Sequence, residues 1–279
     1  MQQGFNTILV TGAAGQLGKL VRQALRGKCR TLRLSDIAPL GEAAAGEELA
    51  PCDLADADAV ASIMKGVDAV IHLGGSLNVD DWQQTLDVNI AGTYHVYEAA
   101  RKHGVKRVIY ASSHHAVGMY PTSENIDDQA PMRPDSLYGL SKCFGENLAR
   151  YCHDKFGLES VCLRIGSTRP KPSEPRELVT WLSENDFNAL IMACLSAPAV
   201  GFTVVYGVSD NPGGWWSNTH ASHLGFHPQD NSAVFRAEID ALAKAGKSAP
   251  DYPLQGGKRA MYGLERSPDS LISKRSTTA

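Results

Sequence analysis

Residues 5–18 read FNTILVTGAAGQLG, and this stretch determines the fold that the sequence predicts. Residues 5–11 have the character of a strand, Gly12, Gly15 and Gly18 follow in the order G-x-x-G-x-x-G, and residues 17–25 are apolar at helical spacing. A strand, a tight glycine turn and a helix N-terminus form an anion site, because backbone N–H groups and the positive end of the helix face the bound group. The stretch therefore predicts a site for the pyrophosphate of a dinucleotide, although glycine turns also occur for packing reasons.

A carboxylate after the next strand-like segment strengthens this prediction. Residues 30–35 form that segment, and Asp36 follows the glycine turn by about 20 residues, where a carboxylate is expected to bind the adenosine ribose hydroxyls. The same charge would repel a 2′-phosphate, so the sequence favours NAD over NADP. Arg33 is a counter-signal; three residues before Asp36 on a strand, its side chain is expected to face the other side and to be solvated.

A second pattern, Tyr138-Gly-Leu-Ser-Lys142, stands 25 residues after Ser113. A tyrosine and a lysine four residues apart lie on one face of a helix, where the ammonium can stabilise a phenolate whose ordinary pKa is ~10. Ser113 ends an apolar stretch over residues 107–111 that reads as a buried parallel strand, so its hydroxyl is expected at the ligand-binding edge of the sheet. Each residue alone could serve packing or face solvent; their spacing predicts a catalytic group with Tyr138 as general base.

The remaining pattern alternates between strand-like and helix-like segments without a repeat. Strands are expected at residues 69–73, 108–111 and 158–165, and helices at residues 56–65, 81–103 and 137–156. This order predicts the α/β class, with a doubly wound parallel-sheet Rossmann fold.

The pattern changes after Gly166. A Pro-rich turn is followed by an expected helix at 183–195, a strand at 203–208 and a helix at 233–245, which should build a small C-terminal substrate lobe. We predict an NAD-binding domain over residues 1–166 and a substrate-binding lobe with a C-terminal tail over residues 167–279, integral to one compact domain. The last dozen residues are expected to be poorly ordered.

Composition excludes several classes of protein. A length of 279 residues with 43% hydrophobic content fits one large α/β core, and a formal charge of −3 without a basic patch argues against nucleic acid. No apolar run approaches the ~18 residues of a membrane span, and residues 1–11 lack the order of a signal peptide, so a cytoplasmic protein is expected. Six cysteines without C-x-x-C spacing indicate reduced thiols.

Adjacent histidines, His114 and His115, raise the question of a metal. On an extended chain they would point to opposite sides, and no carboxylate partner is evident nearby, so no metal is predicted and hydrogen bonding to a substrate is preferred. Trp215 and Trp216 follow Gly213-Gly214 in a loop, where they could form a lid over the core or stack on a sugar.

The chain resembles the extended short-chain dehydrogenases/reductases over residues 7–166. The resemblance rests on the glycine turn, Asp53-Leu54, His72-Leu-Gly-Gly75, Asn89, the serine of SSHHAVG and YGLSK. Within that superfamily, the stretches SSHHAVGMYP, RPDSLYGLSKCFGENLAR, RIGSTRPKP and GWWSNTHASHLGF closely resemble the bacterial uronate dehydrogenases, nearly to residue 235.

The residues and the resemblance together imply NAD as the cofactor and a defined set of site residues. The expected catalytic residues are Ser113, Tyr138, Lys142 and Asn89. Cofactor binding is expected at Gly12, Gly15, Gln16, Leu17, Asp36, Asp53, Leu54, Leu73, Gly74, Gly75, Asn89, Tyr138, Lys142 and Ile165. Substrate binding is expected at Ser76, Ser113, His114, His115, Tyr138, Ser167 and Arg176. In the family the asparagine bends its helix and helps to hold a proton-relaying water; a satisfied polar core residue is the alternative for Asn89.

The substrate follows from an arginine. A planar guanidinium can bind the carboxylate of a hexuronate through two parallel hydrogen bonds, and the resemblance gives this role to Arg176 with Ser167 nearby. Arg169 and Lys171 in the same Pro-rich loop are local competitors. The relatives carry a substrate-contacting serine where this chain has Leu77, with Ser76 one position earlier.

The resemblance implies an NAD-dependent uronate dehydrogenase that is expected to be a homo-oligomer. It would oxidise the C1 hydroxyl of cyclic glucuronate or galacturonate to an aldarolactone, with Tyr138 taking the proton, Ser113 holding the oxygen, and Lys142 lowering the tyrosine pKa and binding the nicotinamide ribose. Two alternatives stay open: a sugar-nucleotide epimerase or dehydratase, and a non-enzymatic NAD-sensing protein.

Overall fold

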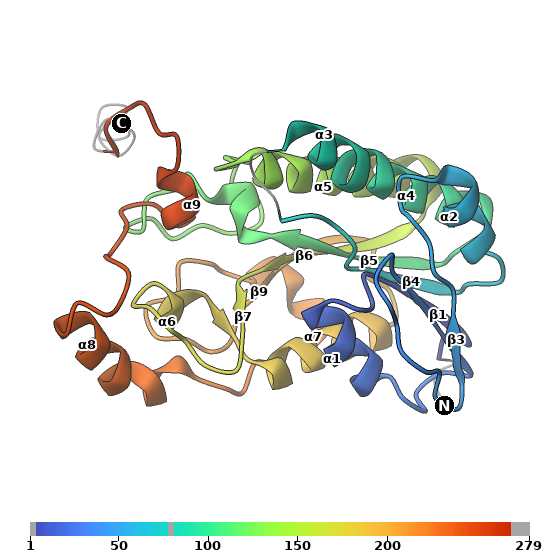
Figure 1. Cartoon of the computed structure of the whole chain (residues 1–279), viewed down its shortest axis with the longest axis horizontal. Coiled ribbons are helices and arrows are strands. Elements are labelled where there is room, and N and C mark those ends of the chain that lie inside the picture. The colour runs from blue at the N-terminus through green and yellow to red at the C-terminus, as the bar shows by residue number, and fades with distance from the viewer. Residues whose placement is uncertain (1–3, 78–80, 269–279) are drawn as a thin grey trace.

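The computed structural model describes residues 4–77 and 81–268, and its centre is a parallel β-sheet (Figure 1). Within these residues the sheet has seven strands in the order β3-β2-β1-β4-β5-β6-β9. The strands are β1 (Thr7–Thr11), β2 (Thr31–Ser35), β3 (Glu47–Leu49), β4 (Ala69–His72), β5 (Arg107–Ser113), β6 (Glu159–Ile165) and β9 (Phe202–Gly207). The strand order reverses between β1 and β4, and doubly wound sheets bind ligands at such a point, beyond the carboxyl ends of the strands. The predicted fold class is confirmed.

Helices cover both faces of the sheet (Figure 1). One face carries α2 (Ala57–Ile63), α4 (Gly92–Lys102) and α5 (Leu137–Phe156), and the other carries α1 (Gln16–Ala24) and α7 (Glu184–Ser196). Two apolar clusters fill the two interfaces, one containing Val60, Val96 and Ala149, the other Val21, Phe187 and Leu190. Every residue of β5 is buried, because a strand covered on both faces has no solvent side.

The helix expected over residues 81–103 forms as three consecutive segments. They are α3 (Trp82–Gln84), the π-helix η1 (Thr85–Ala91) and α4. The wider turn of η1 is marked by the Gly92 N–H, which donates to the carbonyl of Asp87, five residues earlier. Asn89 lies inside this segment, so the irregular part of the helix coincides with a predicted catalytic residue.

The helix α5 begins and ends at the residues that the sequence indicates. The Ser136 hydroxyl accepts a hydrogen bond from the Gly139 N–H at 3.1 Å and caps the first turn. Gly157 ends the helix at φ 70°, a left-handed conformation in which glycine carries no steric cost. These two caps fix where Tyr138 and Lys142 stand above the sheet.

The sequence predicted that the segments after Gly166 build a substrate lobe. Two of them, β9 (Phe202–Gly207) and α7 (Glu184–Ser196), instead join the main sheet and its helix layer. β9 pairs in parallel with β6 and extends the main sheet, while α7 packs beside α1. The remainder consists of β7 (Ser167–Thr168), α6 (Glu177–Thr180), β8 (Trp181–Leu182), η3 (Thr219–Leu224), η4 (Ser232–Phe235), α8 (Arg236–Lys244) and α9 (Lys258–Met261). The expected disorder of the last dozen residues falls mostly on 269–279, outside the described residues.

Arg33 differs from the sequence interpretation. Its side chain is only 15% exposed, and Nη1 donates to the carbonyl oxygens of Ile63 and Lys65 at 2.7 and 2.8 Å. It is therefore not solvated; it joins β2 to the end of α2. No helix in the described part of the chain is long and apolar enough to cross a membrane.

Candidate active site

Two cavities lie along the carboxyl edge of the sheet. One measures about 320 Å³ and reaches Tyr138 and Lys142; the other measures about 360 Å³ and reaches Asp36 and Asp53. Both are lined by Gly12, Gly15, Leu73 and Gly75. Because the glycine turn and the loop after β4 are shared, the cavities are two ends of one groove.

The glycine turn is shaped by close backbone approaches. Gly12 has φ 71°, and a Cβ placed there would lie 2.7 Å from the backbone nitrogen of Gly74. A Cβ at Gly18 would collide with the carbonyl oxygen of Gly12. Gly15 stands at the N-cap of α1 without a side-chain cap, so the first N–H groups of the helix face the groove and suit a phosphate.

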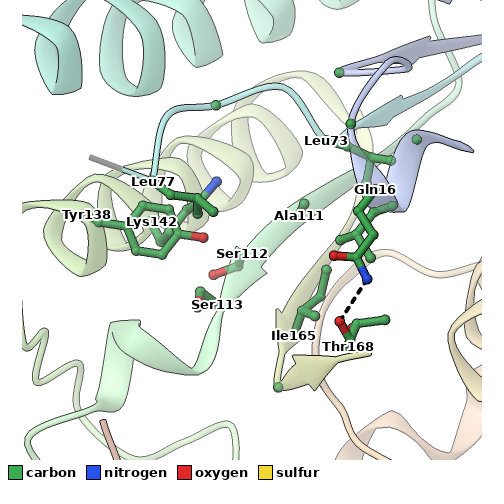
Figure 2. Close-up of a pocket in the computed structure, with 16 residues that line it drawn as sticks. Gln16, Leu73, Leu77, Ala111, Ser112, Ser113, Tyr138, Lys142, Ile165 and Thr168 are labelled. Carbon is green, nitrogen blue, oxygen red and sulfur yellow. Dashed lines mark hydrogen bonds between the residues drawn. The ribbon is translucent and has the colours of Figure 1, made fainter. Parts of the chain in front are cut away.

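Gln16 begins α1 and spans the groove. Its Nε2 donates to the carbonyl oxygen of Thr168 on β7 at 3.1 Å, a contact drawn in Figure 2. Leu17 and Ile165 line the same cavity, as predicted cofactor-binding residues would. Thr168 was not predicted, because nothing in its local sequence marks it.

Asp36 is held at the far end of the groove by backbone N–H groups. One carboxylate oxygen accepts from Ala14 and the other from Ala38, both at 2.9 Å. Ala14 belongs to the glycine turn, so the carboxylate has a fixed place relative to the predicted pyrophosphate site. Asp53 and Leu54 line the same cavity after β3.

Ser113, Tyr138 and Lys142 meet at the other end. Figure 2 shows Tyr138 and Lys142 on α5 facing the end of β5, where Ser112 and Ser113 lie. The hydroxyls of Ser113 and Tyr138 are hydrogen-bonded, and Ser113 Oγ also accepts from the His115 N–H at 3.2 Å. Lys142 Nζ lies 5.3 Å from the centre of the Tyr138 ring. The structure thus brings together the three groups that the spacing predicted.

The protonation of this trio is set mainly by burial. Burial raises the pKa of Tyr138 above its ordinary value, while the hydrogen bond from Ser113 and the charge of Arg259 lower it. Burial also lowers the pKa of Lys142 to about 8. The contribution of Arg259 was not suggested by the sequence, and the expected effect of Lys142 on the pKa of Tyr138 stays a prediction.

Asn89 connects η1 to the loop after β4. Its Oδ1 accepts from the Ser76 N–H at 2.7 Å, and its Nδ2 donates to the Ser76 carbonyl at 2.9 Å and to Ser141 Oγ at 3.2 Å. The side chain therefore fixes the loop that carries Gly74 and Gly75. These contacts agree with the satisfied core role and leave the proton-relay role a prediction.

Ser76 and Leu77 divide between the two cavities. The Ser76 hydroxyl donates to Gln84 Oε1 at 2.7 Å and lines the cavity of Asp36, whereas Leu77 lines the cavity of Tyr138. Ser76 thus lines the cavity of Asp36, and its expected contact with a substrate stays a prediction.

His114, which is buried, and Arg176, which is partly buried, form a relay of hydrogen bonds. His114 Nδ1 lies 2.9 Å from the carbonyl oxygen of Ile165 and must donate to it, so Nε2 is an acceptor and receives the Arg176 Nη2–H at 2.7 Å. Burial lowers the pKa of His114 well below its ordinary value, which agrees with a neutral ring. Both ring nitrogens have protein partners, so His114 holds Arg176 in this structure, and its contact with a substrate stays a prediction.

The interpretation of the two histidines as opposed and without an acidic partner is wrong. Both belong to a 3-10 turn, η2 (His114–Val117), and their rings lie 4.0 Å apart. His115 Nδ1 lies 2.6 Å from Asp135 Oδ2. Burial lowers the pKa of His115 and raises that of Asp135 to about 6, so a neutral His115 donates to the carboxylate at neutral pH.

Arg176 is distinguished from its local competitors by its partners. Arg169 pairs with Glu177 at 3.1 Å, and Lys171 pairs with Glu238 at the surface. Arg176 instead turns inward to His114, and its Nε donates to the Gln255 carbonyl at 2.9 Å. Two of its five N–H groups are thus committed, and the rest remain for a planar anion.

Ser167 and the tryptophans have packing partners. Ser167 Oγ lies 2.9 Å from Thr180 Oγ1 between β7 and α6. The Trp216 ring is stacked on Tyr206 at 5.2 Å, lies 5.5 Å from the His114 ring, and donates to Gln255 Oε1 at 2.7 Å. Trp216 therefore packs against His114 and Tyr206.

Comparisons with known proteins agree with this geometry. The NAD dependent epimerase/dehydratase family matches residues 8–184. The uronate dehydrogenase of Pseudomonas putida is 51% identical over 93% of this chain and 97% of its own length. The glucuronic acid dehydrogenase structure from Chromohalobacter salexigens has a TM-score of 0.88 at 48% identity, covering 93% of this chain and 98% of that chain.

A further solved structure contains the cofactor. It is a tyrosine-to-alanine mutant of the uronate dehydrogenase from Agrobacterium tumefaciens complexed with NAD, with a TM-score of 0.86 at 46% identity over 92% of this chain and 97% of that chain. The chain therefore belongs to the NAD dependent epimerase/dehydratase family and, within it, to the uronate dehydrogenases.

Proposed function

We propose that this NAD-dependent oxidoreductase oxidises the C1 hydroxyl of a cyclic hexuronate, glucuronate or galacturonate, to an aldarolactone. One observation supports the substrate class: the Arg176 guanidinium is held by the Gln255 carbonyl and by His114, the residue that directly follows Ser113. A guanidinium fixed at two of its N–H groups is preorganised for a carboxylate, because less side-chain freedom is lost on binding.

The residues of the groove fit NAD. The glycine turn with Gln16 and Leu17 would hold the pyrophosphate; Asp36, with Asp53 and Leu54 beside it, would hold the adenosine. Leu73, Gly74, Gly75 and Ile165 would form the walls toward the nicotinamide, with Lys142 and Tyr138 at its ribose. When bound, NAD accepts the hydride that leaves C1 of the sugar.

The residues of the chain handle the proton. Ser113 hydrogen-bonds the C1 oxygen and orients it, and ionised Tyr138 removes the hydroxyl proton. Arg176 binds the C6 carboxylate and so positions C1, with Ser167 as a neighbouring hydroxyl. The lactone product then opens in water.

Kinetics of Arg176 variants on an acidic and a neutral sugar test this proposal. Arg176→Lys keeps the charge but loses the fork, so kcat/KM for glucuronate should fall markedly, and Arg176→Ala should lower it by a further ~10-fold or more. Glucose should be a poor substrate of the wild type and hardly affected by either change, because it cannot pair with the arginine.

Lys171→Ala is the matched control, since it removes a cation of the same loop whose partner is the surface residue Glu238. Equal losses on glucose and glucuronate would show that Arg176 supports the fold and does not bind the carboxylate. Turnover of a sugar nucleotide in place of free uronates would favour the epimerase or dehydratase alternative. The homo-oligomeric state and cytoplasmic location expected from the sequence stay predictions.

A further inference from the structure

The C-terminal segment around α9 packs against the proposed active site, although it lies far from it in sequence (Figure 1). The Gln255 N–H donates to the Tyr120 carbonyl and the Gly256 N–H to the Gly118 carbonyl, both at 2.8 Å. A Cβ at Gly256 would collide with the Asp135 carboxylate, and one at Gly257 would lie 2.6 Å from Arg176. The segment is therefore fitted closely against two residues of the site.

This packing delivers a cation to the catalytic tyrosine. The Cζ atom of Arg259 lies 4.8 Å from the centre of the Tyr138 ring. Its Nη1 is buried and has no hydrogen-bond partner among the described residues. Buried guanidinium nitrogens are normally paired; here the face of the Tyr138 ring and the charge of Asp135 are the groups that stabilise the cation.

We propose that Arg259 is a positioning residue that stabilises the ionised form of Tyr138 and so prepares it to accept the substrate proton. The inference rests on the proposed role of Tyr138 as general base. A cation over an aromatic ring is attracted more strongly once the ring carries the negative charge of a phenolate, because a full charge is then added to the quadrupole.

The other polar groups around Tyr138 do not supply the same field. Ser113 donates a hydrogen bond, and the neutral ring of His115 lies 5.9 Å from the Tyr138 ring. Asp135 opposes the ionisation of Tyr138 when it is charged. The Tyr110 ring centre lies 5.1 Å from Lys142 Nζ. Arg176 is turned toward His114. Lys142 adds a positive charge only below its pKa, which burial lowers to about 8, whereas an arginine stays charged throughout the working range. Arg259 also lowers the pKa of Tyr138, in the direction that the geometry requires.

The pH dependence of turnover tests the inference. For Arg259→Gln, the acid limb of kcat/KM should move to higher pH, with a loss of about 10-fold at pH 7 that shrinks as the pH rises, because Tyr138 becomes harder to ionise. Arg259→Lys should keep most of the wild-type profile. Lys258→Gln removes one positive charge from the exposed neighbouring position of α9 and should leave the profile unchanged.

A second readout does not depend on turnover. In protein labelled with 13C at the tyrosine ζ carbon and saturated with NAD, the Tyr138 signal is assigned by its loss in Tyr138→Phe. Its titration midpoint should rise in Arg259→Gln and not in Lys258→Gln. If the wild type oxidised no uronate, the proposed function would fail while this titration still tested the role of Arg259.

Two results would overturn the inference. One is an unchanged Tyr138 titration and an unchanged pH profile in Arg259→Gln. The other is a loss that is equal at every pH and confined to acidic sugars, which would make Arg259 a second carboxylate ligand. If Arg259→Gln failed to fold, the pH profile and the Tyr138 titration would be measured in Arg259→Lys. Wild-type values there would support the inference, and a raised titration midpoint would contradict it.

Discussion

Tyr138 illustrates how much of the chemistry depends on single contacts. It stands in the first turn of α5, hydrogen-bonded to Ser113, with Arg259 over its ring and Lys142 one turn further along. Burial opposes its ionisation, and the Ser113 hydrogen bond and the charge of Arg259 counteract burial. A base so placed is useful only where its surroundings bring its pKa toward the working pH.

Removing the phenol hydroxyl should abolish most of the activity. Tyr138→Phe should lower kcat by at least ~100-fold, because general base catalysis is typically worth ~10²–10⁴. NAD binding, measured by calorimetry or fluorescence, should persist, since the glycine turn and Asp36 are untouched. Near-normal turnover in this folded variant would rule out Tyr138 as the base.

Asp36 should determine the choice of cofactor. Asp36→Ala should weaken the binding of NAD and reduce the ratio of kcat/KM for NAD to that for NADP. The reason is that the carboxylate both binds the ribose hydroxyls and repels a 2′-phosphate. Asp36→Asn keeps the shape of the side chain and removes its charge. It should therefore improve activity with NADP more than it weakens the binding of NAD. Steady-state kinetics with both cofactors measure this, and a wild type that prefers NADP would contradict the assignment.

Spacing predicted the residues that lie close in sequence or on one helix, and missed those joined by the fold. Tyr138 and Lys142 are one helical turn apart, so their common face follows from periodicity alone. Asp135 meets His115 across 20 residues, and Gln255 meets Arg176 across 79, through loops with no periodic pattern. Arg259 was missed for the same reason.

At the scale of elements, the helices with strong caps were predicted to within a residue or two. Ser136 and Gly157 bracket α5, and Ser183 caps α7 with its hydroxyl accepting from Asp186 at 2.9 Å. The π-helix η1 was not predicted as such, since its local composition is that of an ordinary helix. Its place follows from the three hydrogen bonds that Asn89 makes outside the helix.

Loss of those bonds should loosen the loop after β4. Asn89 is 1% exposed, and Asn89→Ala would leave the backbone groups of Ser76 without these partners. We expect a loss of about 1–3 kcal/mol in the free energy of unfolding and weaker binding of NAD, whose groove includes Gly74 and Gly75. Chemical denaturation and NAD titration measure the two effects.

Gln83→Ala serves as the control, because Gln83 lies on the exposed side of α3 and bonds only Asp87 among the contacts described. Loss of stability in Asn89→Ala with unchanged NAD affinity would mean that the asparagine is a core residue without influence on the groove.

At the scale of the whole molecule, the doubly wound order follows from the alternating pattern, but the seventh strand does not. β9 carries the same apolar pattern as the other strands. It is separated in sequence from its neighbour β6 by the Pro-rich turn and α7. This separation suggested a separate lobe. In the fold, β9 pairs with the free hydrogen-bonding edge of β6, and α7 buries its apolar face against the main sheet.

Three neutral histidines buried around the carboxyl edge of the sheet link stability to pH. Burial lowers the pKa of His72 to about 3 and those of His114 and His115 well below the ordinary value. In the unfolded chain these groups titrate near ~6.5, so their contribution to stability is fully present above that pH and is lost as the pH falls. Asp135, with its pKa raised to about 6, acts in the opposite sense, because below that pH the folded protein keeps a proton that the unfolded chain releases.

The balance should favour acid destabilisation. Below the ordinary histidine pKa the unfolded chain binds more protons than the folded chain, so the free energy of unfolding should fall with pH between pH ~6 and ~5, with a slope set by the number of those protons. His72→Gln should reduce this slope by ~1.4 kcal/mol per pH unit, since one of these protons no longer binds. His103→Gln is the control, because His103 is exposed at the end of α4. Denaturation curves of the NAD-free protein at pH 7, 6 and 5 measure the slopes. Equal slopes in the wild type and both variants would mean that His72 is already protonated in the folded protein.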